Sequence, residues 1–179
     1  MKQISTLCLI AIAIVGFFGL TAFKPLTKTS SIYVGEYNAQ LISHQPTGGN
    51  YEWVWTVTNP NPGNGSNGTM QNLSHWSLAI SDMVTDNDLV QVAYSTDGIT
   101  WTDLPAHFAI DKSQECYTGT VLKFDYGTTG GAPTYYKLVV DKDFSEGLST
   151  ANFKSGSKTG CYNSIVTGIG EDPDGSNGR

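Results

Sequence analysis

In the stretch Tyr51-Glu52-Trp53-Val54-Trp55-Thr56-Val57, a large apolar side chain stands at every second position. The odd-numbered residues are aromatic or Val, whereas Glu52 and Thr56 lie between them. A period of two places alternate side chains on opposite faces of a β-strand, while a helix would need a period of 3.6. The stretch therefore predicts a strand that buries one face in a core.

Two further segments, 121–126 and 134–140, alternate in the same way. In the second of them Tyr136, Leu138 and Val140 share one face, and Tyr135 and Lys137 point the other way. We expect these two segments and the 51–57 stretch to pair across a common core.

Other strand-like segments recur between clusters of Gly, Pro, Asn and Asp, with no sustained helical period after the N-terminal run. The full set of expected strands is 31–43, 51–58, 75–80, 89–95, 101–103, 108–110, 117–126, 134–140, 151–153 and 162–167. Many short strands separated by turns predict an all-β fold, a single-domain antiparallel β-sandwich of the immunoglobulin-like or jelly-roll-like kind over residues 31–170. We expect a long loop over 59–68 and a tight hairpin turn at Asp97-Gly98.

The N-terminal residues have the layout of a secretory signal peptide. Lys2 precedes an apolar run from Ile4 to Leu20, and Ala22 offers a small residue for cleavage. We expect residues 1–22 to be this signal, 23–30 a flexible lead and 171–179 a disordered acidic tail. The predicted location is outside the cell or on its surface, with no membrane insertion after cleavage. An uncleaved membrane anchor is the alternative, because the run approaches the length of a membrane span.

Charge and cysteine content fit that location. The formal net charge is −6 at pH 7, and removal of Lys2 with the signal makes the chain more acidic. An acidic chain does not track a phosphate backbone, which argues against nucleic acid as a partner. Only Cys116 and Cys161 follow the signal, and in an oxidising compartment such a pair most simply forms one disulfide.

Aromatic residues provide the most suggestive binding candidates. Flat rings on a sheet or loop can stack on sugars, but a Trp or Tyr in an alternating strand is more often part of the core. Trp101 opens a strand just after the Asp97-Gly98 turn, and Tyr135 is on the outward side of its segment. We therefore expect Trp101 and Tyr135 to be the ligand contacts, with polysaccharide or a cell-surface protein as partner.

Asp82, Asp86 and Asp88 surround one turn and form the best candidate for a metal site. Ca²⁺ takes six to eight oxygen ligands, often from loop carboxylates. Solvated turn carboxylates are the competing interpretation, so calcium is a possible cofactor and no other is indicated.

The sequence contains partial matches to catalytic and cofactor-binding motifs, but none of them is complete. Gly63-x-Gly65-x-x-Gly68 has no helix after it to hold a pyrophosphate, and Lys158-Thr159-Gly160 lacks the second lysine of penicillin-recognising enzymes. The histidines have no metal-binding spacing, and His75 most simply has a structural role. We therefore predict no catalytic residues.

Several short sequence motifs along the chain together carry a resemblance to other proteins. They include the run from Trp55 to Thr69, Leu73-Ser74-His75-Trp76, the run from Val121 to Gly127, Pro133-Thr134-Tyr135-Tyr136-Lys137-Leu138 and Thr159-Gly160-Cys161. Together they resemble uncharacterised secreted β-rich proteins of bacteria such as the Bacteroidota. The resemblance implies secretion and carries no known activity.

The function that these features favour is a secreted or cell-surface binding or structural module, in adhesion, matrix or polysaccharide contact. Two alternatives stay open. One is a polysaccharide-active hydrolase with a dispersed carboxylate pair, which needs two carboxylates about 5–9.5 Å apart. The other is a self-assembling subunit of an extracellular fibre, joined through edge strands.

Overall fold

The computed structural model describes residues 37–114, 117–156 and 161–170, and for Cys161 the backbone only. The predicted signal peptide, lead, tail and Cys116 lie outside the described residues. The ten strands are β1 (Asn38–Thr47), β2 (Asn50–Thr58), β3 (Leu73–Ala79), β4 (Leu89–Ser95), β5 (Thr102–Asp103), β6 (Phe108–Ile110), β7 (Thr120–Phe124), β8 (Thr134–Val140), β9 (Glu146–Ser155) and β10 (Cys161–Ile169). One short 3₁₀ helix, η1 (Asp86–Asp88), precedes β4.

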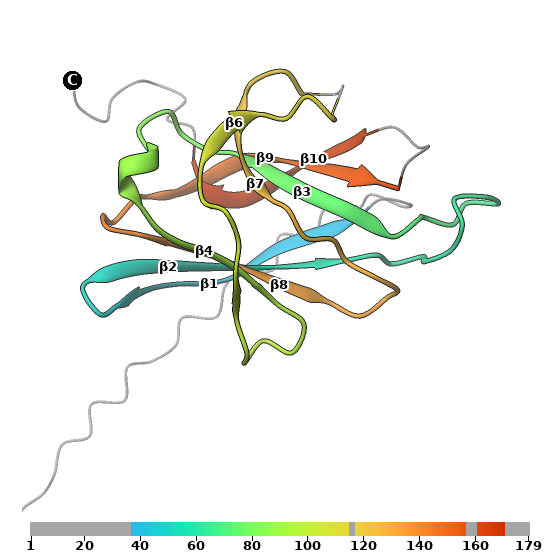
Figure 1. Ribbon diagram of the computed structural model, residues 1–179, viewed down its shortest axis with the longest axis horizontal. Helices are drawn as coiled ribbons and strands as arrows, with labels where there is room; N and C mark the ends of the chain where they lie inside the picture. Colours follow the sequence, from blue (N-terminus) through green and yellow to red (C-terminus); the bar gives the residue numbers. More distant parts are fainter. Residues whose placement is uncertain (1–36, 115–116, 157–160, 171–179) are drawn as a thin grey trace, which may run out of the picture. The chain divides into compact units, whose positions relative to one another are not determined.

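The strands form two five-stranded antiparallel sheets. The first sheet has the order β1-β2-β8-β4-β5, and the second sheet has the order β10-β9-β3-β7-β6. Figure 1 shows the two layers, with β1, β2, β4 and β8 in one and β3, β7, β9 and β10 in the other. The expected antiparallel β-sandwich is confirmed.

β1 and β2 form a hairpin whose turn the alternation did not predict. The turn residues Gly48 and Gly49 have φ angles of 57° and 90°. Two consecutive positive φ angles are the requirement of the tight turns that match strand twist, and glycine meets it without steric cost. β1 therefore continues to Thr47 rather than ending near residue 43.

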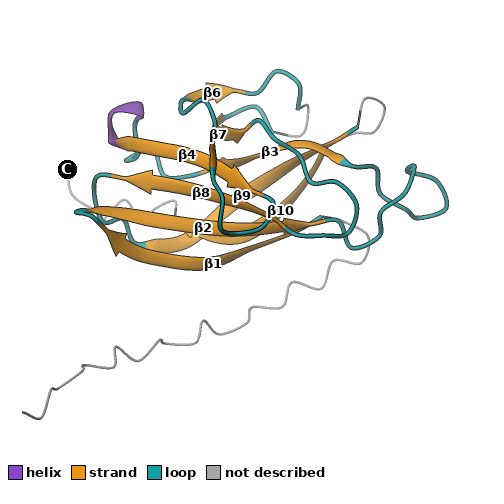
Figure 2. Cartoon of the chain, turned by 60° about the horizontal axis from the view of Figure 1, so that its bottom comes forward, coloured by secondary structure: helices purple, strands orange, loops and turns teal. Residues whose placement is uncertain are grey.

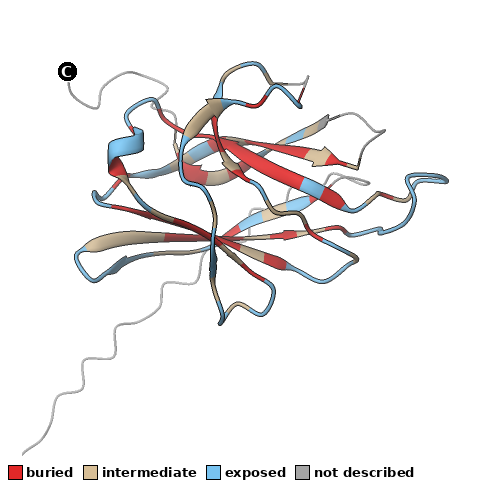
Figure 3. Ribbon diagram, in the orientation of Figure 1, coloured by how far each residue is buried: buried red, intermediate tan, exposed pale blue. Residues whose placement is uncertain are grey.

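The core between the sheets is dominated by aromatic rings. Trp53, Trp55, Trp76, Phe124 and Tyr136 are all fully buried. The ring centroids of Trp76 and Phe124 are 4.8 Å apart, and the planes of the two rings are nearly parallel. Figure 3 shows the buried positions along the strands and the exposed ones in the loops. The inward face predicted for the 51–57 stretch is therefore confirmed.

A hydrogen bond of Trp55 joins the two sheets through this core. The indole N–H of Trp55, on β2, donates to the carbonyl oxygen of Thr167, on β10, at 2.8 Å. Among the described residues the indole nitrogens of Trp53 and Trp76 have no such partner. Trp55 is thus the tryptophan whose polar atom is satisfied across the sandwich.

The expected pairing of the three alternating segments is correct only in part. β2 and β8 are hydrogen-bonded neighbours, with Trp53 opposite Leu138. β7 lies in the other sheet and packs its Phe124 against Tyr136 across the core. Alternation identifies a buried face, but it does not say whether two faces meet side by side or from opposite sheets.

Figure 2 shows a strand-rich body in which η1 is the only helical segment among the described residues. Among the described residues, no helix is both long and apolar enough to cross a membrane.

Candidate functional site

The β4–β5 hairpin is held by a compact hydrogen-bond network around Asp97. Its Oδ1 accepts the backbone N–H groups of Thr100 at 2.7 Å and Ile99 at 2.8 Å, and the hydroxyl of Ser95 at 2.8 Å. The Ser95 hydroxyl in turn accepts the N–H of Gly98 at 2.8 Å. These donors, the Thr100 and Ile99 amides first, hold the pKa of Asp97 well below its usual range. The hairpin is therefore fixed by side-chain bonds rather than by turn geometry alone.

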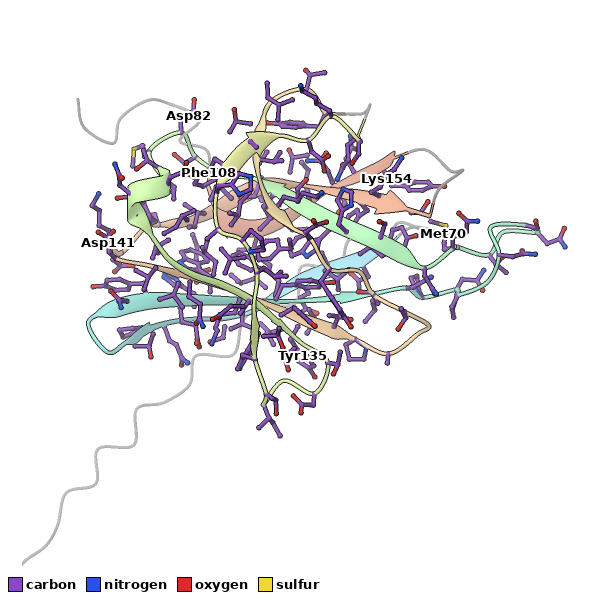
Figure 4. The ribbon with its side chains drawn as sticks, in the orientation of Figure 1. Met70, Asp82, Phe108, Tyr135, Asp141 and Lys154 are labelled. Atoms are coloured by element: carbon purple, nitrogen blue, oxygen red, sulfur yellow. The ribbon has the colours of Figure 1, made fainter. Side chains whose placement is uncertain are left out.

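Trp101 and Tyr135 flank this hairpin on the outer face of the first sheet. Trp101 directly precedes β5, and Tyr135 is opposite Ser95 in the β4–β8 register. The Tyr135 ring lies against the turn, since a Cβ on Gly98 would be 3.3 Å from its Cζ. Figure 4 places Tyr135 beside this hairpin, well away from Asp82. The structure therefore brings the two predicted contact residues together.

Lys137 is the third member of this face. Its Nζ is 4.4 Å from the centroid of the Trp101 ring and 3.8 Å from a carboxylate oxygen of Glu52. Lys137 is buried, with 9% of its surface exposed, whereas Trp101 is half-buried. The indole thus covers the ammonium group, a cation–π arrangement with an opposite charge nearby.

Exposure on this face differs from the expectation in one respect. Trp101 and Tyr135 are half-buried rather than fully exposed, because one packs over Lys137 and the other over Gly98. The most exposed large apolar residue is Ile99 at the hairpin tip, with 82% of its surface in solvent. We name Ile99, Trp101 and Tyr135 the hairpin face.

Asp88 does not behave as a metal ligand. It is the last residue of η1 and is buried, and its Oδ2 accepts the backbone N–H and the hydroxyl of Thr85, each at 2.8 Å. Its Oδ1 accepts from the ammonium group of Lys142. These partners, Lys142 first, hold the pKa of Asp88 below its usual value. Its carboxylate caps the 3₁₀ helix and neutralises Lys142.

Asp86 and Asp82 are also not gathered around a common point with Asp88. Asp86 Oδ1 accepts the backbone N–H of Phe108 at 2.7 Å, so it anchors β6. Asp82 and Asp86 line an open pocket of about 290 Å³ between η1 and β6, whose lining does not include Asp88. Within the described residues, no group of three or more His, Cys, Asp or Glu side chains could hold a metal ion. The geometry therefore gives no support to the calcium site predicted from this turn.

A buried cluster on the outer face of the second sheet joins His75, on β3, to the segment after β6. His75 Nε2 is 2.7 Å from Asp111 Oδ2. The hydroxyl of Ser113 donates to Asp111 Oδ1 at 2.6 Å and is 3.3 Å from the same His75 nitrogen. In a catalytic triad the serine and the carboxylate occupy opposite imidazole nitrogens. Here both are at Nε2, and the serine proton is directed to the aspartate.

The ionisation of this cluster follows from its surroundings. Burial, and next the charge of Lys123, lower the pKa of His75 against the opposing effect of Asp111. Burial acts to raise the pKa of Asp111, but the hydrogen bonds from Ser113 and the neighbouring positive charge outweigh it, and the net shift is downward. At neutral pH a neutral imidazole therefore donates to an ionised carboxylate.

A second pocket, of about 250 Å³, opens beside this cluster and is lined by Asp111, Lys123 and Asp125, among others. Lys123 Nζ and Asp125 Oδ1 form an ion pair at 3.1 Å. A glycosidase needs one protonated carboxyl group with a raised pKa as general acid. Asp111 has the opposite shift and its oxygens are engaged by Ser113 and His75. The pair of carboxylates in this pocket does not meet the requirement.

The sequence indicated Trp101 and Tyr135 as contact residues and placed Lys137 only on the outward side of its strand. It did not indicate the role of Lys137, Ile99 or the Asp111–His75 contact. The Ser95-x-Asp97-Gly98 pattern is a signal for the turn network, because Ser and Asp side chains bond to backbone N–H groups two residues on. No local signal joins His75 to Asp111, since the two lie on different elements.

No protein-family model, curated protein or solved structure matches this chain.

Proposed function

We propose that the protein is a secreted or cell-surface binding module without catalytic activity, and that it contacts polysaccharide through the hairpin face. One observation carries the proposal: Trp101 and Tyr135, distant in sequence, flank the same rigid hairpin on the outer face of the first sheet. Partly exposed rings near polar side chains are suited to stacking on sugars.

The rigidity of the hairpin supports this role. A loop that is already ordered loses less conformational entropy when it binds, so more of its contact energy appears as affinity. The Asp97 network supplies that order before any ligand arrives. The buried Lys137 fixes the plane of the Trp101 ring from beneath.

The hydrolase alternative has less support. In the pocket lined by Asp111 and Asp125, Asp111 is ionised and hydrogen-bonded, and Asp125 is paired with Lys123. In the pocket lined by Asp82 and Asp86, Asp86 already accepts the backbone N–H of Phe108. A polysaccharide binder needs only the aromatic face, so we favour binding over hydrolysis.

The test is affinity electrophoresis of the purified full chain through gels that contain a panel of polysaccharides. We expect retardation on at least one gel, and loss of it in Trp101→Ala and in Tyr135→Ala. Phe108→Ala is the matched control, because Phe108 is also half-buried but lies in the second sheet. Near-ultraviolet circular dichroism checks that each variant keeps its core.

Two results would contradict the proposal. Migration unchanged on every gel would remove polysaccharide as the ligand class for the sugars in the panel. Retardation that Phe108→Ala abolishes but Trp101→Ala keeps would place the binding on the other sheet.

A further inference from the structure

The charged side chains of the first sheet are few and mostly negative. Over its five strands and the β4–β5 hairpin, Lys137 is the one lysine or arginine, and the carboxylates are Glu52, Asp97 and Asp103. Asp97 and Asp103 are exposed, and Glu52 is half-buried. The hairpin face therefore has more negative than positive charge around it.

The ammonium group of Lys137 is not available to an anionic ligand. It lies beneath the Trp101 ring, 4.4 Å from the ring centroid, and 11% of the Lys137 side chain is exposed. A carboxylate oxygen of Glu52, 3.8 Å away, already supplies an opposite charge. A sulfate or uronic-acid group at the hairpin face would meet the exposed carboxylates first, and it would have to displace the indole to reach the one cation. Like charges brought together across an interface cost binding free energy.

Asp103 adds a hydrogen-bond acceptor to this face. It comes two residues after Trp101, and a period of two puts both side chains on the same side of the chain. Its register partner Ala93 is opposite Lys137, so Asp103 is on the Lys137 side of the sheet. Gln91 Nε2 donates to Asp103 Oδ1 at 2.6 Å, and no hydrogen bond from a described residue reaches Oδ2. The carboxylate is therefore held by one oxygen and can accept from a ligand with the other.

We infer that the hairpin face takes an uncharged polysaccharide, one hydroxyl group of which donates a hydrogen bond to Asp103 Oδ2. The inference rests on the proposed function and narrows its ligand class. A neutral sugar ring presents apolar C–H groups on its face and hydroxyl groups at its edge, so an aromatic pair with a fixed carboxylate beside it matches both. A hydroxyl group that donates to a carboxylate forms a shorter and stronger bond than one between neutral groups.

The first test compares polymers that share a backbone and differ in charge. The purified full chain is run through gels that contain hydroxyethyl cellulose or carboxymethyl cellulose, methyl-esterified pectin or polygalacturonate, and dextran or dextran sulfate. Mobility is measured relative to a gel without polymer. The chain has a formal net charge of −6, so the gels contain about 0.15 M salt, at which a Debye length of about 8 Å screens repulsion by its distant charges.

We expect retardation by the uncharged member of at least one pair, and retardation at least about tenfold weaker by its charged partner. Retardation by a charged member alone, or equally by both members of a pair, would overturn the inference and leave the proposed function standing. No retardation on any gel would overturn the proposed function for these backbones, and the inference with it.

The second test removes the charged acceptor. Asp103→Asn keeps the size of the side chain and an oxygen for Gln91, so we expect retardation by the uncharged polymer to weaken about five- to tenfold. Asp82→Asn is the matched control, because it removes the same charge from an exposed residue that Figure 4 places away from Tyr135. Both aspartates are exposed, so neither substitution leaves a cavity in the core. Equal retardation of the two variants would overturn the inference.

Discussion

At the scale of single residues, buried polar groups decide which substitutions the core tolerates. Trp53 and Trp55 are fully buried neighbours on one face of β2, with their ring centroids 6.0 Å apart. They differ in that Trp55 donates to Thr167 O, and Trp53 Nε1 has no partner among the described residues. The two positions therefore allow the hydrogen bond to be separated from the loss of aromatic volume.

We expect Trp55→Phe to destabilise the fold more than Trp53→Phe. Both changes remove similar volume, but the first also leaves the partly buried carbonyl oxygen of Thr167 without its donor, which costs about 1–3 kcal/mol. Chemical denaturation of the two variants measures the difference in the free energy of unfolding. Equal losses would mean that the bond across the sandwich adds nothing to stability.

His75 makes the stability depend on pH. Because its pKa is lowered in the folded protein, the unfolded chain binds a proton more readily than the folded chain. The stabilisation from the neutral imidazole is full above the ordinary histidine pKa of 6.5 and is lost as the pH falls through and below that value. Asp111, whose folded pKa is also lowered, adds a loss in more acidic solution.

We therefore expect the free energy of unfolding to fall between pH 7 and pH 5, and to fall less in His75→Gln. Urea denaturation at each pH measures this. Because Gln does not titrate, an identical slope in the variant would assign the pH dependence to other groups.

At the scale of elements, strand positions could be predicted well and strand partners poorly. The bounds of β4, β6 and β8 match the prediction, because Gly, Pro or Asp residues flank an apolar run. β9 was expected only over 151–153 but runs from Glu146 to Ser155, since Gly147 and Ser149 hide its alternation. β9 pairs with β10 on one side and with β3 on the other, and nothing local in β9 or β3 predicts their pairing.

In the candidate site, too, the direction of a side chain could be predicted from the sequence, but its contacts could not. Tyr135 could be placed on an outward face from alternation alone, and the structure puts it there. The burial of Lys137 under Trp101 could not be predicted, because it depends on where β5 returns. The three aspartates were grouped by closeness in sequence, while their hydrogen-bond partners Thr85, Lys142 and Phe108 draw them apart.

Close packing of the β7–β8 connection against β3 gives an element-scale test. A Cβ on Gly127 would be 1.7 Å from the backbone oxygen of Leu73, whereas on Gly131 its nearest contact would be 3.7 Å away. We expect Gly127→Ala to cost about 1–3 kcal/mol or more, because backbone must move. Gly131→Ala in the same connection should be nearly neutral, and thermal unfolding compares the two. Equal melting temperatures would show that the connection yields freely.

At the scale of the whole molecule, the segment after β6 crosses the outer face of the second sheet. Asp111 and Ser113 contact His75 on β3, and the amide of Gln114 is 3.5 Å from the carbonyl of Asn152 on β9. This path leads towards β10, where Cys161 begins the pairing with β9.

We propose that Cys116 and Cys161 form the disulfide expected from the sequence, and that it fastens this segment. Closing a loop of about 45 residues contributes about 3–4 kcal/mol in the chain-entropy model. Peptide mapping without reduction should recover the two cysteines in one fragment, and reduction should lower the free energy of unfolding by that amount. Two free thiols in the folded protein would refute the bond.

The order of strands in the sheets also determines when the protein can fold. β8 lies between β2 and β4, and β9 lies between β3 and β10. A ribosome that has made the chain as far as Tyr126 has produced a first sheet in two unconnected halves and a second sheet without β9 and β10. A fragment truncated there should be digested rapidly by protease, and the full chain should fold in milliseconds to seconds, as distant pairings require. A nascent polypeptide that stays unfolded until its last third is made remains, throughout synthesis, in the threadable form that a narrow export channel can accept.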